Sequence, residues 1–265
     1  MSEEKGLAGQ VIEQSSGVLG KAYDDLAHPS AKSLGNTLSL VPRTIGVWLS
    51  KWEKWVINGE ESIRLTAQAV QEKAKTIPEE KLTEPEPYVA IPAVQQLSYC
   101  YDSEELRELY ANLLVSSMNV DTKNQVHPSF VDIIKQLSPL DAKALEVMKQ
   151  GSSVLPIVTV RLNFKENKAF NELLVDYAID LIALFNDTDL LSASLQNLDR
   201  LGIIKIRYDQ KIKPDNSYDV FYQDLIYKDL VATFGNIQNT EISLSKGLIE
   251  LTEFGKAFCK SCCEK

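Results

Sequence analysis

The chain has 265 residues, a formal net charge of −9 and 44% hydrophobic residues, which is ordinary for a soluble globular protein of one or two domains. The acidic balance disfavours contact with nucleic-acid phosphates except where basic residues cluster. No apolar run approaches the roughly 20 residues that span a bilayer, and the first ten residues lack a secretion signal, so we expect a cytoplasmic protein.

The first hundred residues predict helices. Glycine and serine between residues 6 and 20 weaken the first of them. Stronger helical patterns cover residues 43–57 and 60–75. Four prolines between residues 77 and 92 make a long helix improbable there, so this segment is expected to be a connector that is extended in places.

Three tryptophans, Trp48, Trp52 and Trp55, recur at spacings of three and four and therefore share one face of the helix expected over residues 43–57. The favoured interpretation is a stripe that is buried in the core. The alternative is a surface that lies on a membrane or on a partner, with Lys51 and Lys54 elsewhere on the helix.

The middle of the chain has the clearest helix starts. Asp102 can cap a helix in which Glu105 lies three residues further on. Ser138 is expected to cap another helix, with Pro139 in its first turn and Asp141 near its positive end. One apolar face is predicted for the first of these helices, from Leu106, Leu109, Tyr110 and Leu113.

The two histidines, His28 and His127, each precede a proline, at Pro29 and Pro128. A residue before proline is pushed out of helical geometry, and a polar side chain there can face the free amides of the next helix. Capping or packing is therefore favoured over a catalytic or metal-binding pair. No HExxH spacing accompanies either histidine.

After Gly151 the composition changes. Residues 153–164 predict a strand that Pro156 restricts to a sheet edge or a break. A strongly apolar helix is expected over residues 168–185. A capped helix after Asp187 should then stop at Gly202.

Two further strands and a last helix complete the chain. Ile204, Ile206 and Tyr208 alternate in the manner of a strand. A strand is also expected from Lys246, followed by a helix that Thr252 caps. This order of elements is typical of a winged helix-turn-helix.

The expected fold is mainly α. An N-terminal helical region over residues 1–125, with its proline-rich connector at 77–92, precedes a winged-helix-like domain over 126–265. The second domain has a small β-wing, which residues 209–241 enlarge.

Several stretches together resemble one bacterial family. They are AYDDLAHPSAKSLGNTLSLVPRTI, IPEEKLTEPEPYVAIPAVQQLSYC, EELRELYANLLVSSMN, VHPSFVDIIKQLSPLDAKAL, SLQNLDRLGII and LTEFGKAFC. The chain resembles the abortive infection alpha family, once catalogued as a domain of unknown function. The resemblance implies a protein of defence against phage that halts the growth of infected cells, and it implies no known active site.

A basic segment offers a nucleic-acid interpretation. It contains Arg200, Lys205, Arg207, Lys211 and Lys213 against one acidic residue, Asp209. The helix before it carries three aspartates and only one of these basic residues, which is poor for reading a DNA groove. Packing or protein binding is therefore the favoured use of this module.

The C-terminal cysteines offer a metal interpretation. Cys259 and Cys263 share a helix face and Cys262 lies beside them, but zinc takes four ligands and the fourth would have to be Cys100 or a distant histidine. Ordinary tail thiols are favoured, and no metal or cofactor is expected.

No phosphate-binding loop, dinucleotide-binding turn or nucleophile elbow occurs in the sequence. We therefore expect a protein without enzymatic activity that acts by association with a host or phage protein, or with a second copy of itself. The alternatives are a membrane-perturbing effector that uses the tryptophan stripe, a nucleic-acid-binding regulator and, less favoured, a hydrolase that uses the histidines.

Overall fold

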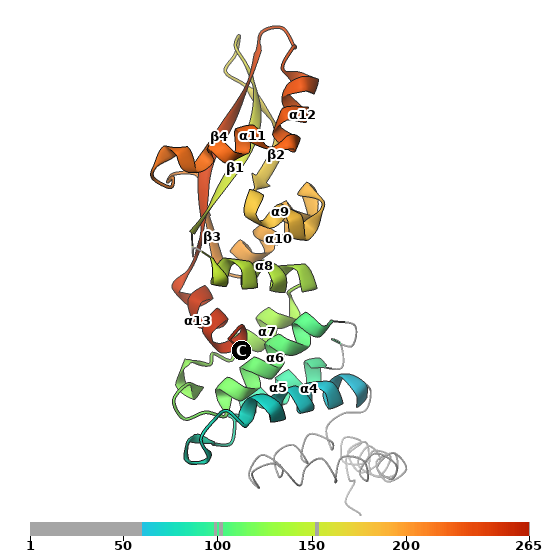
Figure 1. Ribbon diagram of the computed structural model, residues 1–265, viewed down its shortest axis with the longest axis vertical. Coiled ribbons are helices and arrows are strands. Elements are labelled where there is room, and N and C mark those ends of the chain that lie inside the picture. Colours follow the sequence, from blue (N-terminus) through green and yellow to red (C-terminus); the bar gives the residue numbers. More distant parts are fainter. Residues whose placement is uncertain (1–59, 98–99, 101–102, 152–153, 265) are drawn as a thin grey trace, which may run out of the picture. The chain divides into compact units, whose positions relative to one another are not determined.

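The computed structural model describes residues 60–97, 100, 103–151 and 154–264, all within one compact unit, Lys51–Lys265 (Figure 1). The helices expected before residue 60, with His28 and the three tryptophans, lie outside this part of the chain. The α-helices are α4 (Glu60–Ala74), α5 (Pro87–Leu97), α6 (Glu104–Ser117), α7 (Ser129–Lys135), α8 (Pro139–Gln150), α9 (Ile179–Phe185), α10 (Thr188–Arg200), α11 (Asp219–Gln223), α12 (Leu225–Phe234) and α13 (Glu253–Cys262). The 3₁₀ helices are η3 (Glu79–Lys81), η4 (Lys123–Gln125) and η5 (Asp215–Tyr218).

Helix α6 is the centre of the helical part, because α4, α5, α7, α8 and α13 all pack against it. Leu109, Tyr110, Leu113 and Leu114 of α6 are buried in these contacts. The expected helix is confirmed, but its cap is wrong by one residue: Ser103 is the N-cap, and its hydroxyl accepts a hydrogen bond from the backbone N–H of Leu106 at 3.2 Å.

The connector expected over residues 77–92 is wrong in its second half, where α5 begins at Pro87 and continues through Pro92. A proline inside a helix removes one backbone hydrogen bond and strains the preceding turn. Tertiary packing outweighs this cost, because Val89, Ala93 and other apolar residues of α5 are buried against neighbouring helices.

The helix starts at α7 and α8 confirm the sequence analysis. The Nδ1 atom of His127 lies 3.2 Å from the backbone N of Ser129, so this histidine faces the amides at the start of α7. At α8, Ser138 and Asp141 form a capping box in which each side chain accepts the other residue's backbone N–H.

The four strands are β1 (Val154–Phe164), β2 (Phe170–Tyr177), β3 (Ile204–Arg207) and β4 (Thr240–Leu251). They form one antiparallel sheet in the order β2-β1-β4-β3, with Val154 opposite Glu250 and Phe164 opposite Thr240. Pro156 is tolerated because β2 pairs with β1 only from Val158 onwards, so β1 has a neighbour on one side at the proline.

Helices α9 and α10 pack against this sheet, α9 on β1 and α10 on β2 and β3. The core between them contains side chains that are almost fully buried, namely Ile157, Val158, Leu181, Leu195, Leu198 and Ile249. The capped helix after Asp187 and its stop at Gly202, where φ is +74°, are confirmed as predicted.

The helix expected over residues 168–185 is wrong, because its first half is β2 and only Ile179–Phe185 is helical. The segment is rich in apolar residues with polar ones between them, so periodicity alone does not separate a helix from a strand. Pairing with β1 decides the outcome, with Asn163 opposite Phe170 and Val160 opposite Leu174.

The mainly α fold class is therefore wrong: the chain is mixed α/β with a four-stranded antiparallel sheet. A winged-helix-like module with a small wing is not supported, since β1 and β4 are 11 and 12 residues long and residues 209–241 include η5, α11 and α12. Long-range strand pairing produced this difference, which local patterns do not report. The domain boundary at 125/126 stays a prediction.

Candidate functional site

The basic residues of the nucleic-acid interpretation begin at the C-terminal end of α10 and continue along and beyond β3. Arg200 closes α10, Lys205 and Arg207 lie on β3, and Lys211 and Lys213 are exposed in the segment that follows. The structure therefore places the first three close to the junction between α10 and the sheet, where acidic groups also gather.

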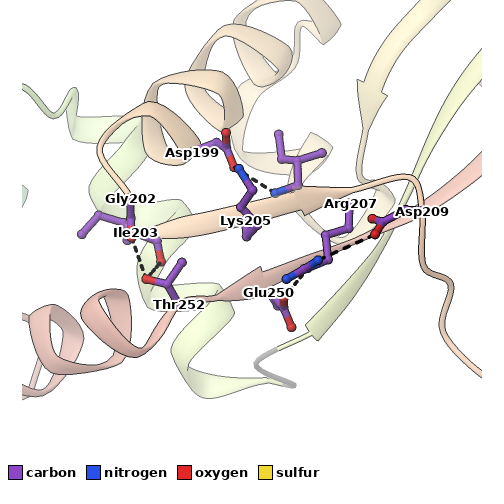
Figure 2. Close-up of polar contacts among 9 residues, drawn as sticks. Asp199, Gly202, Ile203, Lys205, Arg207, Asp209, Glu250 and Thr252 are labelled. Carbon is purple, nitrogen blue, oxygen red and sulfur yellow. Dashed lines mark hydrogen bonds and ion pairs between the residues drawn. The ribbon is translucent and has the colours of Figure 1, made fainter.

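Arg207 is held by the strand beside it. Its Nε lies 2.7 Å from Oε1 of Glu250 on β4, and its Nη1 lies 3.8 Å from Oδ2 of Asp209, as Figure 2 shows. The hydrogen bond to Glu250 is the main reason that the pKa of Arg207 is raised. The guanidinium charge is compensated by two carboxylates.

Lys205 points toward Asp199 of α10, with Nζ 3.4 Å from Oδ1 (Figure 2). The same Oδ1 accepts the backbone N–H of Ile206 at 3.0 Å, so Asp199 joins α10 to β3. Arg200 donates instead to Asn197 Oδ1 at 2.8 Å and to Gln136 Oε1 at 3.1 Å. Three of the five basic side chains proposed for nucleic acid are thus engaged within the fold.

Thr252 forms the junction between β4 and α13 (Figure 2). Its hydroxyl donates to the carbonyl oxygen of Gly202 at 2.6 Å and accepts the N–H of Gly255 at 2.8 Å, which makes it the N-cap of α13 as predicted. Only glycine fits at position 255, because a Cβ there would overlap the carbonyl oxygen of Ile203. This close approach seats α13 on the turn before β3.

The polar contacts of Asp199, Lys205, Arg207 and Glu250 form a first cluster, at the junction of α10 with the sheet. A second polar cluster, the Asp176 cluster, joins β1, β2 and α10 to the residue that follows β3. The hydroxyl of Tyr208 donates to Oδ1 of Asp176 at 2.9 Å and lies 2.8 Å from Oγ1 of Thr159. Gln196 donates to Oδ2 of Asp176 at 3.2 Å. Asp176 is buried and has a φ of +53°, next to the irregular register between β1 and β2. Burial raises the pKa of Tyr208.

A third cluster centres on the buried carboxylate of Asp141, which closes the capping box of α8. Its Oδ1 accepts the hydroxyl of Ser194, and its Oδ2 accepts Nδ2 of Asn197 at 3.3 Å and the backbone N–H of Ser138 at 2.8 Å. Asp141 thus links α8 to α10. Both carboxylate clusters are satisfied by donors from the fold itself, which is the pattern of a structural network.

The histidine and cysteine positions can be compared with the metal interpretation. The ring of His127 packs tilted against Phe130 and edge-on against Phe254, with ring centroids 5.9 Å away in both cases. Cys100, Cys259 and Cys262 are buried and Cys263 is half-buried. Among the described residues no group of three potential metal ligands comes together.

The sequence analysis missed one surface, which lies on α11, α12 and the turn after α12 (orange in Figure 1). Five of the twelve large apolar side chains that are exposed in the described part of the chain lie between residues 220 and 237. We call them the α11–α12 surface: Val220, Tyr222, Leu225, Val231 and Ile237. The sequence does contain a signal for the helix α12, because an aspartate, Asp224, directly precedes its apolar residues. In the structure this side chain caps α12 and accepts the N–H groups of Ile226 and Tyr227.

Helix α12 shows the surface most clearly. None of its ten residues is buried, although its sequence is LIYKDLVATF. Leu225 is 74% exposed. An apolar helix that buries no residue is unusual in an isolated chain, because the hydrophobic effect favours covering such a surface.

The three tryptophans of the membrane interpretation lie outside the described residues. Within the described part, no helix combines the length and the apolar character that crossing a membrane requires. The membrane interpretation through Trp48, Trp52 and Trp55 therefore stays a prediction.

Comparison with known proteins gives one match. Neither a search of curated proteins nor a search of solved structures returned any. A family model described as abortive infection alpha matches residues 58–262, which is most of the chain and includes all three polar clusters and the α11–α12 surface. The chain belongs to the abortive infection alpha family.

Proposed function

We propose that this protein acts in abortive infection by binding another protein, from the host or the phage, and not by catalysis. The family supports the setting in defence. The observation that carries the mode of action is the α11–α12 surface, in which Leu225, Val231 and three further large apolar side chains are exposed. Exposed apolar groups concentrated on one segment are typical of protein-binding sites.

The secondary structure of this segment supports the same proposal. Asp224 caps α12, and the hydroxyl of Tyr177 on β2 donates to its Oδ1 at 3.1 Å. The side chains of Tyr218 in η5 and Phe221 in α11 are buried, and Tyr218 donates to the carbonyl of Gly247 at 2.7 Å. The two helices are therefore anchored from beneath, so their exposed side chains are presented by an ordered scaffold.

The charges of the basic segment favour association with protein over binding of nucleic acid. Arg207 and Lys205 contact carboxylates of Glu250 and Asp199, so contact with a phosphate would require these pairs to be broken. The satisfied carboxylates of Asp176 and Asp141 support a role without catalysis in the same way, since each accepts hydrogen bonds from the fold.

The test is a phage challenge of cells that express the full chain. The double variant Leu225→Asp, Val231→Asp places two charges on the α11–α12 surface without filling the core. We expect it to lose protection, so that phage plaque on these cells as they do on cells without the protein. The matched control is Leu190→Asp, an apolar residue on α10 that is 53% exposed and lies outside this surface; it should still protect.

Thermal unfolding of the purified variants shows whether each is folded. Full protection by a folded Leu225→Asp, Val231→Asp variant would contradict the use of this surface. Chemical cross-linking in infected cells then identifies what the surface touches: a cross-linked host or phage protein that is lost in the double variant supports the proposal, and a cross-link to a second copy alone contradicts it.

A further inference from the structure

The outer side of β4 has no neighbouring strand over more than half of its length. β4 pairs with β1 from Thr240 to Glu250, but β3 pairs with it only from Leu248 to Leu251. In the described part of the chain, no strand lies beside the outer side of β4 before Leu248. We call residues 240–246 the β4 edge. It offers room for a further strand.

Backbone groups of the β4 edge point toward this open side. On β3, the N–H of Ile206 donates to Asp199 Oδ1 at 3.0 Å, away from β4, so the next residue directs its backbone groups toward Leu248. The direction alternates from residue to residue along an antiparallel pair, and the register of β4 with β1 is continuous. Ile242 and Leu244 therefore direct their N–H and C=O groups outward, as Leu248 does.

The other long outer strand, β2, is protected against the addition of a strand. Its register with β1 is irregular on both sides of Val160, and Asp176 near its end has a φ of +53°. Such irregularities bend an edge and disfavour pairing with another chain. The β4 edge has a regular register, no proline and no residue with a positive φ. Regular edges of this kind are templates for pairing.

The apolar side chains of the β4 edge are incompletely covered. Val160 and Leu162 on β1 are 1% and 4% exposed, whereas their partners on β4, Leu244 and Ile242, are only half-buried. Burial thus decreases across the sheet from β1 toward the β4 edge. A strand added beside β4 would cover both side chains, which the hydrophobic effect favours.

We propose that the β4 edge pairs antiparallel with the β4 edge of a second copy of this chain, about a two-fold axis at Ser243. Ile242 of each copy then lies opposite Leu244 of the other, so that apolar side chains meet across the axis. Glu241 lies opposite Ser245, and no like charges oppose each other. The edge is therefore complementary to itself.

The charges of the β4 edge favour this antiparallel arrangement. Glu241 lies near one end of the edge, and Lys246 lies at the other, with its Nζ 5.2 Å from the ring centroid of Tyr218. Parallel pairing in register would bring like charges side by side. Antiparallel pairing brings the end of each copy that holds Glu241 next to the end of the other that holds Lys246. The two-fold axis makes this attraction occur twice.

Analytical ultracentrifugation of the full chain tests the pairing. We expect the wild type to sediment with twice the 29.7 kDa mass of one chain. Ser243→Lys places two lysines opposite each other at the axis and should raise the dissociation constant of the dimer about fivefold or more. The matched control is Ser245→Lys, which makes the same change two residues further on, opposite Glu241, and should leave the dimer intact or tighten it.

Disulfide trapping tests the position of the axis. Ser243 opposes its own counterpart at a position without backbone hydrogen bonds, where Cα atoms lie about 4.5 Å apart, within the range of about 4.4–6.8 Å that disulfides bridge. Oxidised Ser243→Cys should therefore run as a disulfide-linked dimer on a non-reducing gel. Ser245→Cys should not, because it opposes Glu241. Mixing Ser243→Lys with Ser243→Glu should restore a dimer.

The mass of the wild type decides the question even if a variant does not fold, which circular dichroism shows. A wild-type chain that stays monomeric at every concentration measured would overturn the proposal, as would a folded Ser243→Lys variant that dimerises as well as the wild type, or trapping through Ser245→Cys in place of Ser243→Cys. The pairing goes beyond the proposed function and does not use the α11–α12 surface. The Leu225→Asp, Val231→Asp variant should therefore remain dimeric, so the two proposals fail separately.

Discussion

The Nε atom of Arg207 on β3 lies 2.7 Å from Oε1 of Glu250 on β4, so the guanidinium is held by the strand beside it. We predict that replacing Lys205 and Arg207 with alanine leaves DNA binding as weak as in the wild type. If these side chains neutralised phosphates, the slope of log affinity against log salt would become shallower by about 0.9 for each side chain removed. Fluorescence anisotropy with duplex DNA over a series of salt concentrations measures this slope.

The matched control for that prediction is Glu250→Gln, which releases Arg207 without changing the shape of the side chain. It should raise DNA retention at low salt above that of the wild type. Salt-sensitive binding by the wild type that disappears in the double alanine variant would instead support the nucleic-acid interpretation.

We predict that replacing Asp141 causes a large loss of stability, because its buried carboxylate accepts several hydrogen bonds. Asp141→Ala removes the capping box of α8, leaves the buried hydroxyl of Ser194 without its acceptor and takes one of two acceptors from Asn197, which should lower the free energy of unfolding by about 2 to 4 kcal/mol. Asp187→Ala, at the exposed N-cap of α10, is the control and should cost about 1 kcal/mol. Urea unfolding followed by circular dichroism gives both values; equal losses would contradict the special role of Asp141.

The close approach at Gly255 predicts that even one methyl group is costly. In Gly255→Ala the new Cβ overlaps the carbonyl oxygen of Ile203, so α13 must shift away from the turn before β3, at a cost of about 1 to 3 kcal/mol. At Gly151 the nearest atom to a Cβ is 3.4 Å away, so Gly151→Ala should change stability by less than about 0.5 kcal/mol. Calorimetric melting temperatures compare the two; a Gly255→Ala variant as stable as the wild type argues against the contact.

The buried phenol of Tyr177 should make the free energy of unfolding depend on pH in the alkaline range. Burial raises the pKa of Tyr177, and the Asp224 carboxylate and its hydrogen bond raise it further. Below the ordinary tyrosine pKa of about 10 the phenol is neutral in both the folded and the unfolded chain. Above it the unfolded chain ionises first, so the stabilising contribution of a buried neutral phenol is lost as the pH rises.

The free energy of unfolding of the wild type should therefore fall above pH ~10 more steeply than that of Tyr177→Phe, which has no proton to release. At neutral pH the variant should be less stable by about 1 to 3 kcal/mol, because it loses the hydrogen bond to Asp224. Tyr88→Phe, at a side chain that is 57% exposed, is the control. Identical slopes for Tyr177→Phe and the wild type would refute this assignment.

The sequence by itself determined the local features of this protein. The caps at Ser138 and Thr252, the stop at Gly202 and the histidine at the start of α7 were all predictable, because each depends on hydrogen bonds between residues a few positions apart. The family could also be recognised from its short stretches, as the match over residues 58–262 confirms.

Only the tertiary structure decided the fold class and the state of the candidate sites. β2 was mistaken for a helix because its sequence fits either structure until β1 supplies the hydrogen bonds. The sequence analysis counted the basic segment as uncompensated, because Glu250, the partner of Arg207, is 43 residues away along the chain. The exposure of Leu225 likewise depends on what does not pack against α12. Contacts between distant segments decide these features, because a local pattern can predict a helix or a strand but not what packs against it.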